Sequence, residues 1–218
     1  MDKQIAVIFD MDGVLVFNNE FHDLAWQLFC KKYRIDLGEG YIKKSFGGTN
    51  RSFLTSFFGP MSDDRIRELA EEKEAMYRKL YAKAIQLPEG LHDLLEELAT
   101  AGIPMAVATS APVSNVDFVL DHTGIRKYFL HIVDETFVKK GKPDPEVYAI
   151  TAGKLGITPS SCLVFEDSIV GVEAAVNAGM KVVGITSTFT RAQISKATFI
   201  IGSYKEINLG MVKEILLS

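Results

Sequence analysis

The chain has 218 residues, 47% of them hydrophobic, and a formal net charge of −4. This length fits one large domain or a core with a modest insertion, and the composition supports a sizeable folded core. A weakly acidic chain is unlike most nucleic-acid-binding proteins, which present a basic face. No apolar run approaches the roughly 20 residues of a membrane-spanning helix, and the first residues do not resemble a signal peptide. We therefore expect a cytoplasmic protein whose partners include neither nucleic acid nor membrane.

The first predicted strand covers residues 5–9 and leads directly into Asp10 and Asp12. A short continuous apolar run of this kind is typical of a strand buried on both faces of a parallel sheet. Residues two apart on an extended chain point the same way, so both carboxylates are expected to project from the carboxyl end of the strand. An Asp-Gly pair alone predicts only a turn. Two converging carboxylates, however, are unfavourable unless a cation or a shared proton compensates them.

The segment after the first strand contains helical patterns and no convincing strand. A tight turn is expected over residues 13–16, and apolar residues at helical spacing then predict helices over residues 19–33, 41–45, 52–58 and 63–83. We interpret residues 16–86 as a small α-helical unit inserted beside the carboxyl end of the first strand. In that place it could act as a lid over the active edge of the sheet.

From residue 87 onward, helices and strands alternate along the chain. The predicted helices cover residues 91–101, 114–122, 144–155, 169–178 and 205–217, and the predicted strands cover residues 104–108, 131–133, 162–165, 181–185 and 199–201. This alternation indicates βαβ units, and hence an α/β fold whose parallel sheet is covered by helices on both faces. We expect residues 1–15 and 87–218 to form this core.

Four groups of reactive side chains lie at or just beyond the ends of predicted strands: Asp10 with Asp12, Thr109 with Ser110, Lys142, and Glu166 with Asp167. Each group alone has an ordinary explanation, because a hydroxyl or an acid after a strand commonly caps the next helix and a loop lysine is usually solvated. The carboxyl ends of parallel strands, however, meet at one edge of the sheet, where open α/β proteins bind ligands. We therefore expect the four groups to form one site.

The acids of this site predict a magnesium-dependent nucleophile. Asp10, Glu166 and Asp167 supply hard oxygen ligands, and Mg²⁺ prefers a few carboxylates together with water and substrate phosphate. That cation and Lys142 would keep Asp10 ionised among its acidic neighbours. An ionised carboxylate beside a bound phosphate is a nucleophile, so Asp10 is expected to form an aspartyl-phosphate.

The remaining residues of the site fit supporting roles in phosphoryl transfer. Thr109 and Lys142 can donate hydrogen bonds to phosphoryl oxygens, on which negative charge is spread in the transition state. Asp12 can protonate the leaving oxygen and later deprotonate the attacking water.

Four motifs carry these residues, in order along the whole chain: Asp10-Met11-Asp12-Gly13-Val14-Leu15, Ala108-Thr109-Ser110, Gly141-Lys142-Pro143-Asp144-Pro145, and Phe165-Glu166-Asp167-Ser168 followed by Gly171-Val172-Glu173-Ala174-Ala175. They resemble the four motifs of the haloacid dehalogenase superfamily, most closely its phosphatase and β-phosphoglucomutase branch. The resemblance implies a Rossmann-like core with a helical cap inserted after the first strand. It also implies magnesium bound by Asp10, by the backbone carbonyl of Asp12 and by Asp167, with Glu166 among or beside the ligands.

The resemblance extends into the helical unit. His22, Ala25 and Trp26 resemble the first cap helix of phosphoglucomutase-like members, and Gly48-Thr49-Asn50-Arg51 resembles their substrate-facing loop. Arg51 then stands at the position of a phosphate-holding arginine. Each residue also has a structural interpretation, since Trp26 fits core packing, His22 a hinge or surface position and Arg51 a surface ion pair.

Two residues of the core, Ser110 and Asn115, are further candidate substrate contacts. Both also fit the ordinary composition of a helix start. The sequence does not specify the substrate, and we expect a monomer or a weak dimer.

Several activities are compatible with parts of this pattern. A haloalkanoate dehalogenase is disfavoured because that branch lacks the second aspartate, Asp12, and a response-regulator receiver is disfavoured because its nucleophile follows a later strand. A phosphosugar mutase of the β-phosphoglucomutase type must hold a second phosphate, for which Arg51 is the candidate, but Val16-Phe17-Asn18-Asn19 departs from the acidic or hydroxyl-rich hinge of such mutases. We predict a magnesium-dependent phosphatase acting on a small phosphorylated metabolite such as a sugar phosphate. The mutase is the alternative, and a phosphoryl-regulated binding module is a more distant one.

Overall fold

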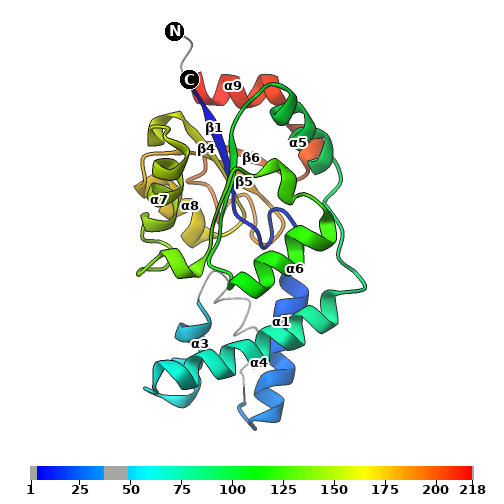
Figure 1. Cartoon of the computed structure of the whole chain (residues 1–218), viewed down its shortest axis with the longest axis vertical. Coiled ribbons are helices and arrows are strands. Elements are labelled where there is room, and N and C mark those ends of the chain that lie inside the picture. The colour runs from blue at the N-terminus through cyan, green and yellow to red at the C-terminus, as the bar shows by residue number, and fades with distance from the viewer. Residues whose placement is uncertain (1–3, 37–48, 218) are drawn as a thin grey trace. The chain divides into compact units, whose positions relative to one another are not determined.

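The computed structural model describes residues 4–36 and 49–217 (Figure 1). By their internal contacts the residues divide into two compact units, one comprising Met1–Phe17 and Gln86–Ser218 and the other Asn18–Ile85. The helix predicted over residues 41–45 lies outside the described residues. Among the described residues, no helix combines the length and apolar character that a membrane crossing requires.

The first unit is built on a parallel sheet with the strand order β3-β2-β1-β4-β5-β6. Its strands are β1 (Ala6–Phe9), β2 (Met105–Ala108), β3 (His131–Val133), β4 (Cys162–Glu166), β5 (Lys181–Ile185) and β6 (Phe199–Ile201). Every residue of β1, β2 and β4 is buried, which explains why these strands are apolar runs, with Glu166 at the end of β4 the one charged exception. The predicted α/β fold with a parallel sheet is therefore confirmed.

Strand β1 lies between β2 and β4, whose ends also carry residues of the predicted site. Phe9, the last residue of β1, pairs with Val107 of β2 on one side and with Phe165 of β4 on the other. The residues that follow these three strands consequently emerge side by side at the carboxyl edge. The chain order of the sheet reverses between β1 and β4, and such a reversal is the usual position of a ligand site in open α/β sheets.

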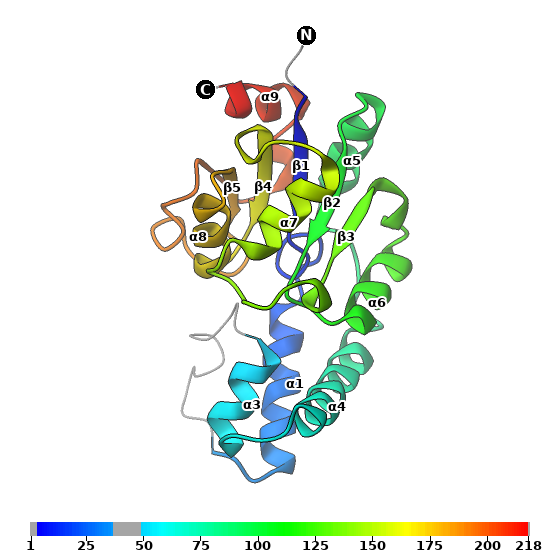
Figure 2. The same cartoon turned by 60° about the vertical axis from the view of Figure 1, so that its left-hand side comes forward.

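Helices cover both faces of this sheet (Figures 1 and 2). Helices α7 (Glu146–Leu155) and α8 (Ile169–Asn177) lie on one face, and α5 (Leu91–Thr100) and α9 (Leu209–Leu217) lie on the other. Helix α6 (Val113–Thr123) follows β2. Four leucines at helical spacing bury one side of α5, as the periodicity predicts: Leu91, Leu94, Leu95 and Leu98. Single 3-10 turns occur at Arg126–Tyr128, Glu135–Phe137, Pro159–Ser161 and Tyr204–Glu206.

The continuous helix predicted over residues 205–217 is wrong. A 3-10 turn over Tyr204–Glu206 precedes α9, and Ile207 between them is extended, with φ −139° and ψ 146°. The carboxamide of Asn208 accepts a hydrogen bond from the Met211 amide at 3.1 Å, so this side chain caps a new helix start. Apolar spacing alone does not reveal such a break, because Ile207 before it and Val212 and Leu216 after it are all buried apolar residues.

The second unit contains the helices α1 (Asn19–Lys32), α3 (Asn50–Phe58) and α4 (Asp63–Tyr81). The hydroxyls of Thr49 and Ser62 accept amide hydrogen bonds at the starts of α3 and α4, where such residues satisfy unpaired N–H groups. Helix α4 packs against α1 and α3. Their shared core contains Trp26, Phe29, Cys30, Phe53, Leu54, Ile66 and Leu69.

Candidate active site

The chain turns sharply directly after β1. Asp10 is buried, and the carbonyl of Met11 accepts hydrogen bonds from the amides of the turn, the shortest from Leu15 at 2.9 Å. Gly13 has a φ of 76°, a conformation that a residue with a β-carbon adopts at a cost. The extended backbone stops earlier than the argument for two parallel carboxylates assumed, since β1 ends at Phe9 and the turn begins at Met11. Asp12 nevertheless lies close enough for its charge to act on Asp10.

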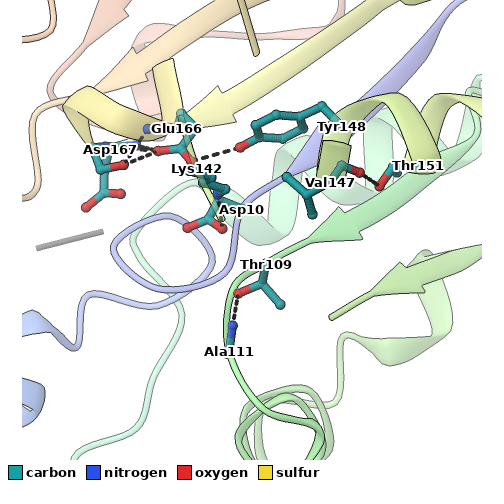
Figure 3. Close-up of polar contacts among 11 residues, drawn as sticks. Asp10, Thr109, Ala111, Lys142, Val147, Tyr148, Thr151, Glu166 and Asp167 are labelled. Atoms are coloured by element: carbon teal, nitrogen blue, oxygen red, sulfur yellow. Dashed lines mark hydrogen bonds and ion pairs between the residues drawn. The ribbon is translucent and has the colours of Figure 1, made fainter. Parts of the chain in front are cut away.

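Three acids form a buried cluster at the carboxyl edge of the sheet (Figure 3). Carboxylate oxygens of Asp10, Glu166 and Asp167 all lie within 4.8 Å of one another, a spacing at which they could hold one metal ion. Asp10 follows β1, Glu166 ends β4 and Asp167 comes next. The register of the sheet therefore assembles acids that are more than 150 residues apart in sequence.

A buried lysine joins two of these acids. The ammonium of Lys142 donates to Oδ1 of Asp10 at 2.8 Å and to Oε1 of Glu166 at 2.6 Å. Only 4% of the Lys142 side chain is exposed. Its ammonium also lies 5.0 Å from the ring centre of Tyr148, so the cation is enclosed by groups that favour its charge.

Glu166 is held rigidly by the surrounding protein. Its Oε1 accepts a hydrogen bond from the Tyr148 hydroxyl at 2.8 Å, in addition to that from Lys142. Its Oε2 accepts from the amides of Asp167 and Ser168, both at 2.9 Å, and from the Ser168 hydroxyl at 3.1 Å. Ser168 also caps α8 by accepting from the Gly171 amide, so the cap expected at this helix start is provided by Ser168.

Gly171 leaves the space that Glu166 occupies, and its replacement is expected to be destructive. A β-carbon at this position would lie 1.8 Å from Oε1 of Glu166. We expect Gly171→Ala to lower the free energy of unfolding by roughly 1–3 kcal/mol, the usual effect of overpacking. The matched control is Gly153→Ala in α7, where nothing lies within 4 Å of the added carbon. There the helix propensity of alanine should stabilise the protein by about 0.5–1 kcal/mol. Urea denaturation measures both, and equal effects at the two glycines would contradict the packing argument.

The electrostatics of the cluster indicate a shortage of positive charge. The pKa of Asp10 is raised to about 7, chiefly because burial disfavours the ionised form; Lys142 opposes this shift, and Glu166 and Asp12 add to it. The pKa of Asp167 is raised well above its usual value by burial and by the nearby acids. Three carboxylates beside one ammonium would leave two uncompensated negative charges, which one divalent cation would balance. The donor set therefore fits a hard divalent metal ion.

Lys142 and Glu166 stay charged in this environment. Burial alone would lower the pKa of Lys142, but Asp10 and Glu166 outweigh it and raise the pKa well above its usual value. Burial likewise favours neutral Glu166, but the charge and hydrogen bonds of Lys142, together with the Ser168 and Tyr148 donors, lower its pKa. The pair thus forms a permanent ionic support beside Asp10.

The residues predicted after β2 lie at the same edge of the sheet. Thr109 is buried and directly follows β2. Figure 3 shows that its side chain lies on the same side of the sheet edge as Asp10. Its hydroxyl accepts a hydrogen bond from the Ala111 amide at 3.1 Å. Ser110 is half-buried in the turn, and Asn115 is completely buried in the first turn of α6.

The candidate residues of the helical unit fall into two different environments. Arg51 is more than half exposed and forms an ion pair with Asp63 at 2.7 Å, which agrees with its structural interpretation. His22 instead stacks on Tyr77 with ring centres 3.7 Å apart, and its Nδ1 lies 2.9 Å from the ammonium of Lys73. Trp26 stacks on Phe53 in the core of the unit.

Lys73 and Glu74 are buried residues that sequence reasoning did not select. Lys73 is 2% exposed, and its ammonium lies 2.9 Å from Glu74 and 4.9 Å from the ring centre of Trp26. Asn50 also donates to Glu74 at 2.9 Å. The sequence does contain an indication of this buried lysine, because Lys73 lies on the side of α4 that otherwise carries apolar residues: Ile66, Leu69, Tyr77 and Tyr81. A lysine at a core position of a helix indicates a buried charge network.

The parallel sheet and its buried carboxylate–lysine cluster define a Rossmann-like α/β protein with an acidic site at the carboxyl edge. A family model described as haloacid dehalogenase-like hydrolase matches residues 7–185. The chain belongs to this family, which confirms the resemblance of the four motifs.

Individual relatives support this assignment along the whole chain. A phosphorylated carbohydrates phosphatase of Thermotoga maritima is 29% identical over 97% of this chain and 99% of its own length. A β-phosphoglucomutase of Bacillus subtilis is 32% identical over 83% of this chain and 82% of its own length. The crystal structure of a hydrolase of family IA, variant 3, from Entamoeba histolytica superposes with a TM-score of 0.89 at 32% identity, covering 99% of this chain and 100% of the other.

Proposed function

We propose that the protein is a magnesium-dependent phosphatase that hydrolyses a small phosphorylated metabolite, such as a sugar phosphate. The observation that carries the proposal is the buried Asp10, 2.8 Å from the Lys142 ammonium and clustered with Glu166 and Asp167. An acid placed between a cation and a metal-binding cluster is suited to attack phosphorus. The phosphatase relative that matches nearly the whole chain supports the same activity.

Magnesium would be held by Asp10 and Asp167 and by the backbone carbonyl of Asp12. When bound, it would neutralise negative charge on the phosphoryl oxygens. Glu166 stands beside these ligands as an orienting group, because its two oxygens already accept five hydrogen bonds from the protein.

The chain's own residues divide the reaction between them. A carboxylate oxygen of Asp10 attacks phosphorus, forming an aspartyl-phosphate as the bond to the leaving oxygen breaks. Asp12 donates its proton to that leaving oxygen and then takes a proton from water, which hydrolyses the aspartyl-phosphate and releases phosphate. Lys142 and Thr109 donate to the phosphoryl oxygens during both steps.

Substrate recognition is proposed to involve the helical unit as a cap. In the sequence, residues 16–86 lie between β1 and β2. The chain therefore leaves the core shortly after Asp10. Ser110 and Asn115 are candidate contacts from the core, and His22 and Arg51 are candidates from the cap. The half-buried position of His22 beside Lys73 favours it over Arg51, whose guanidinium is already paired with Asp63.

A broad phosphate-ester screen tests the proposed activity. Purified protein should release inorganic phosphate from one or more sugar phosphates over many turnovers with millimolar Mg²⁺, and EDTA should abolish release. Magnesium should also raise the midpoint of thermal unfolding, because a ligand that binds only the folded state stabilises it. Phosphate release that is equal in EDTA would refute the magnesium site, and the absence of turnover on all esters would refute the phosphatase.

A phosphosugar mutase is the second candidate, favoured by the similarity to the Bacillus subtilis β-phosphoglucomutase. Both activities require Asp10, Asp12 and Lys142, but a mutase must return the phosphoryl group to the sugar. Phosphorus NMR of a reaction with β-glucose 1-phosphate and a bisphosphate primer separates the two. We expect free phosphate, whereas accumulation of glucose 6-phosphate would assign the protein to the mutases.

A further inference from the structure

The loop after β5 contacts the acidic site although none of the four motifs includes it. The hydroxyl of Thr188 donates a hydrogen bond to Oδ2 of Asp167. The neighbouring Ser187 hydroxyl donates to the carbonyl of Gly13 at 2.5 Å. One short stretch thus contacts both Asp167 and the turn that carries Asp12.

The sheet explains how this loop reaches the site. Strand β5 lies next to β4, with Gly184 paired to Glu166, so the chain leaves β5 alongside the buried acids. The amide of Thr186 donates to the carbonyl of Ile201 in β6 at 3.0 Å, which anchors the start of the loop. Phe189 packs against the core of the sheet unit and anchors its end. Thr188 is therefore held between two fixed points.

The opposite side of the contact is fixed as well. The amide of Gly13 donates to the carbonyl of Val16 at 2.8 Å, and the Tyr204 hydroxyl donates to the carbonyl of Val14 at 3.1 Å. With Ser187 bound to Gly13, the loop and the turn form one hydrogen-bonded frame around the acids. A hydroxyl in such a frame can fix the orientation of a carboxylate.

We propose that Thr188 is a positioning residue for the metal site. Its hydroxyl donates to Oδ2 of Asp167 and fixes the torsion of that carboxylate, which keeps the carboxylate oriented to hold the metal. The inference rests on the magnesium site of the proposed function. It adds a residue that contacts the magnesium ligand Asp167 and does not itself bind the metal. Partners of this kind typically contribute 10–100-fold to metal affinity.

Direct metal binding tests the inference without any substrate. Thr188→Val removes the hydroxyl with little change of volume, Thr188→Ser retains the donor, and Thr188→Ala is a second variant without a hydroxyl should the valine disturb folding. Thr190→Val is the matched control, because its hydroxyl lies in the same loop but contacts Gln193 at 2.9 Å. Electron paramagnetic resonance of free Mn²⁺ gives the dissociation constant of each EDTA-treated protein, and circular dichroism verifies its fold.

The expected result is a dissociation constant for Mn²⁺ that is about 10–100-fold weaker in Thr188→Val and Thr188→Ala. Thr188→Ser should restore most of the affinity, and Thr190→Val should leave it unchanged. Wild-type affinity in folded Thr188→Val would overturn the positioning role while leaving the proposed phosphatase intact. Absence of Mn²⁺ binding to the wild-type protein would overturn the magnesium site itself, and with it both proposals.

Discussion

Replacement of Asp10 by asparagine is expected to lower phosphatase turnover by on the order of 10⁴-fold or more, as does the removal of other covalent nucleophiles. An amide cannot form the acyl phosphate and is also a poor ligand for magnesium. The fold should survive, because asparagine has nearly the same volume and Lys142 keeps its 2.6 Å contact with Glu166. We expect the free energy of unfolding to fall by no more than about 1.5–3 kcal/mol, the contribution of one hydrogen bond to a charged group, because burial already disfavours the ionised form of Asp10.

A second aspartate provides the control for this variant. Asp134 follows β3 as Asp10 follows β1, and it is equally buried, at 7% exposure. Its carboxylate accepts a hydrogen bond from the Thr136 amide at 2.8 Å, an ordinary capping role that asparagine can also fill. Initial rates and urea denaturation should therefore show Asp134→Asn close to the wild-type protein in both respects. Residual turnover of Asp10→Asn within tenfold of wild type would remove Asp10 from the role of nucleophile.

Replacement of Lys142 by methionine is expected to damage both activity and stability. The change removes the cation that lies between Asp10 and Glu166 and leaves the buried acids facing each other without a counter-charge. Breaking a buried ion pair by removing one partner costs about 3–5 kcal/mol. Loss of one preorganised donor to the phosphoryl oxygens should lower turnover by roughly 10²–10³-fold. Without Lys142, the pKa of Asp10 would rise above about 7, since the charge that opposes its shift is gone. In the metal-free protein a larger share of Asp10 would then be protonated at neutral pH.

The control lies two residues away. Lys140 is three-quarters exposed and sits 3.6 Å from Asp144, so Lys140→Met should change stability by less than about 1 kcal/mol, as expected for a surface pair. Urea denaturation in EDTA measures the protein contribution alone, and initial rates with saturating magnesium measure catalysis. If Lys142→Met unfolded at the same urea concentration as Lys140→Met, the ion pair would not be what keeps these acids buried.

The sheet was predictable because its strands are signalled by composition. Buried parallel strands must be apolar on both faces, and the runs ending at Phe9, Ala108 and Phe165 are short, continuous and followed by polar residues. Those polar residues could then be gathered at one edge by topology alone. Periodicity failed where side-chain hydrogen bonds decide the backbone, as at Asn208, whose carboxamide starts a new helix inside an apolar pattern.

Part of the site could not be found from sequence motifs. Tyr148 and Thr188 bind Glu166 and Asp167 through single hydroxyl groups, and a lone Tyr or Thr is chemically unremarkable until the fold places it. Lys73 could have been found, because a charged residue on the buried side of α4 conflicts with the helical pattern. Residues that conflict with the local pattern are thus easier to detect than those that fit it.

The bond between Ser187 and Gly13 joins residues 174 positions apart, and that between Lys142 and Asp10 joins residues 132 positions apart. Contacts between such distant residues require the central strand, both of its neighbours and β5 to be in place first, and they are entropically unfavourable until then. We therefore expect the acidic cluster to assemble late on the folding pathway. Interactions absent from the transition state alter the rate of unfolding more than the rate of folding. A cation bound by these acids would accordingly slow the unfolding of the core and leave its rate of folding unchanged.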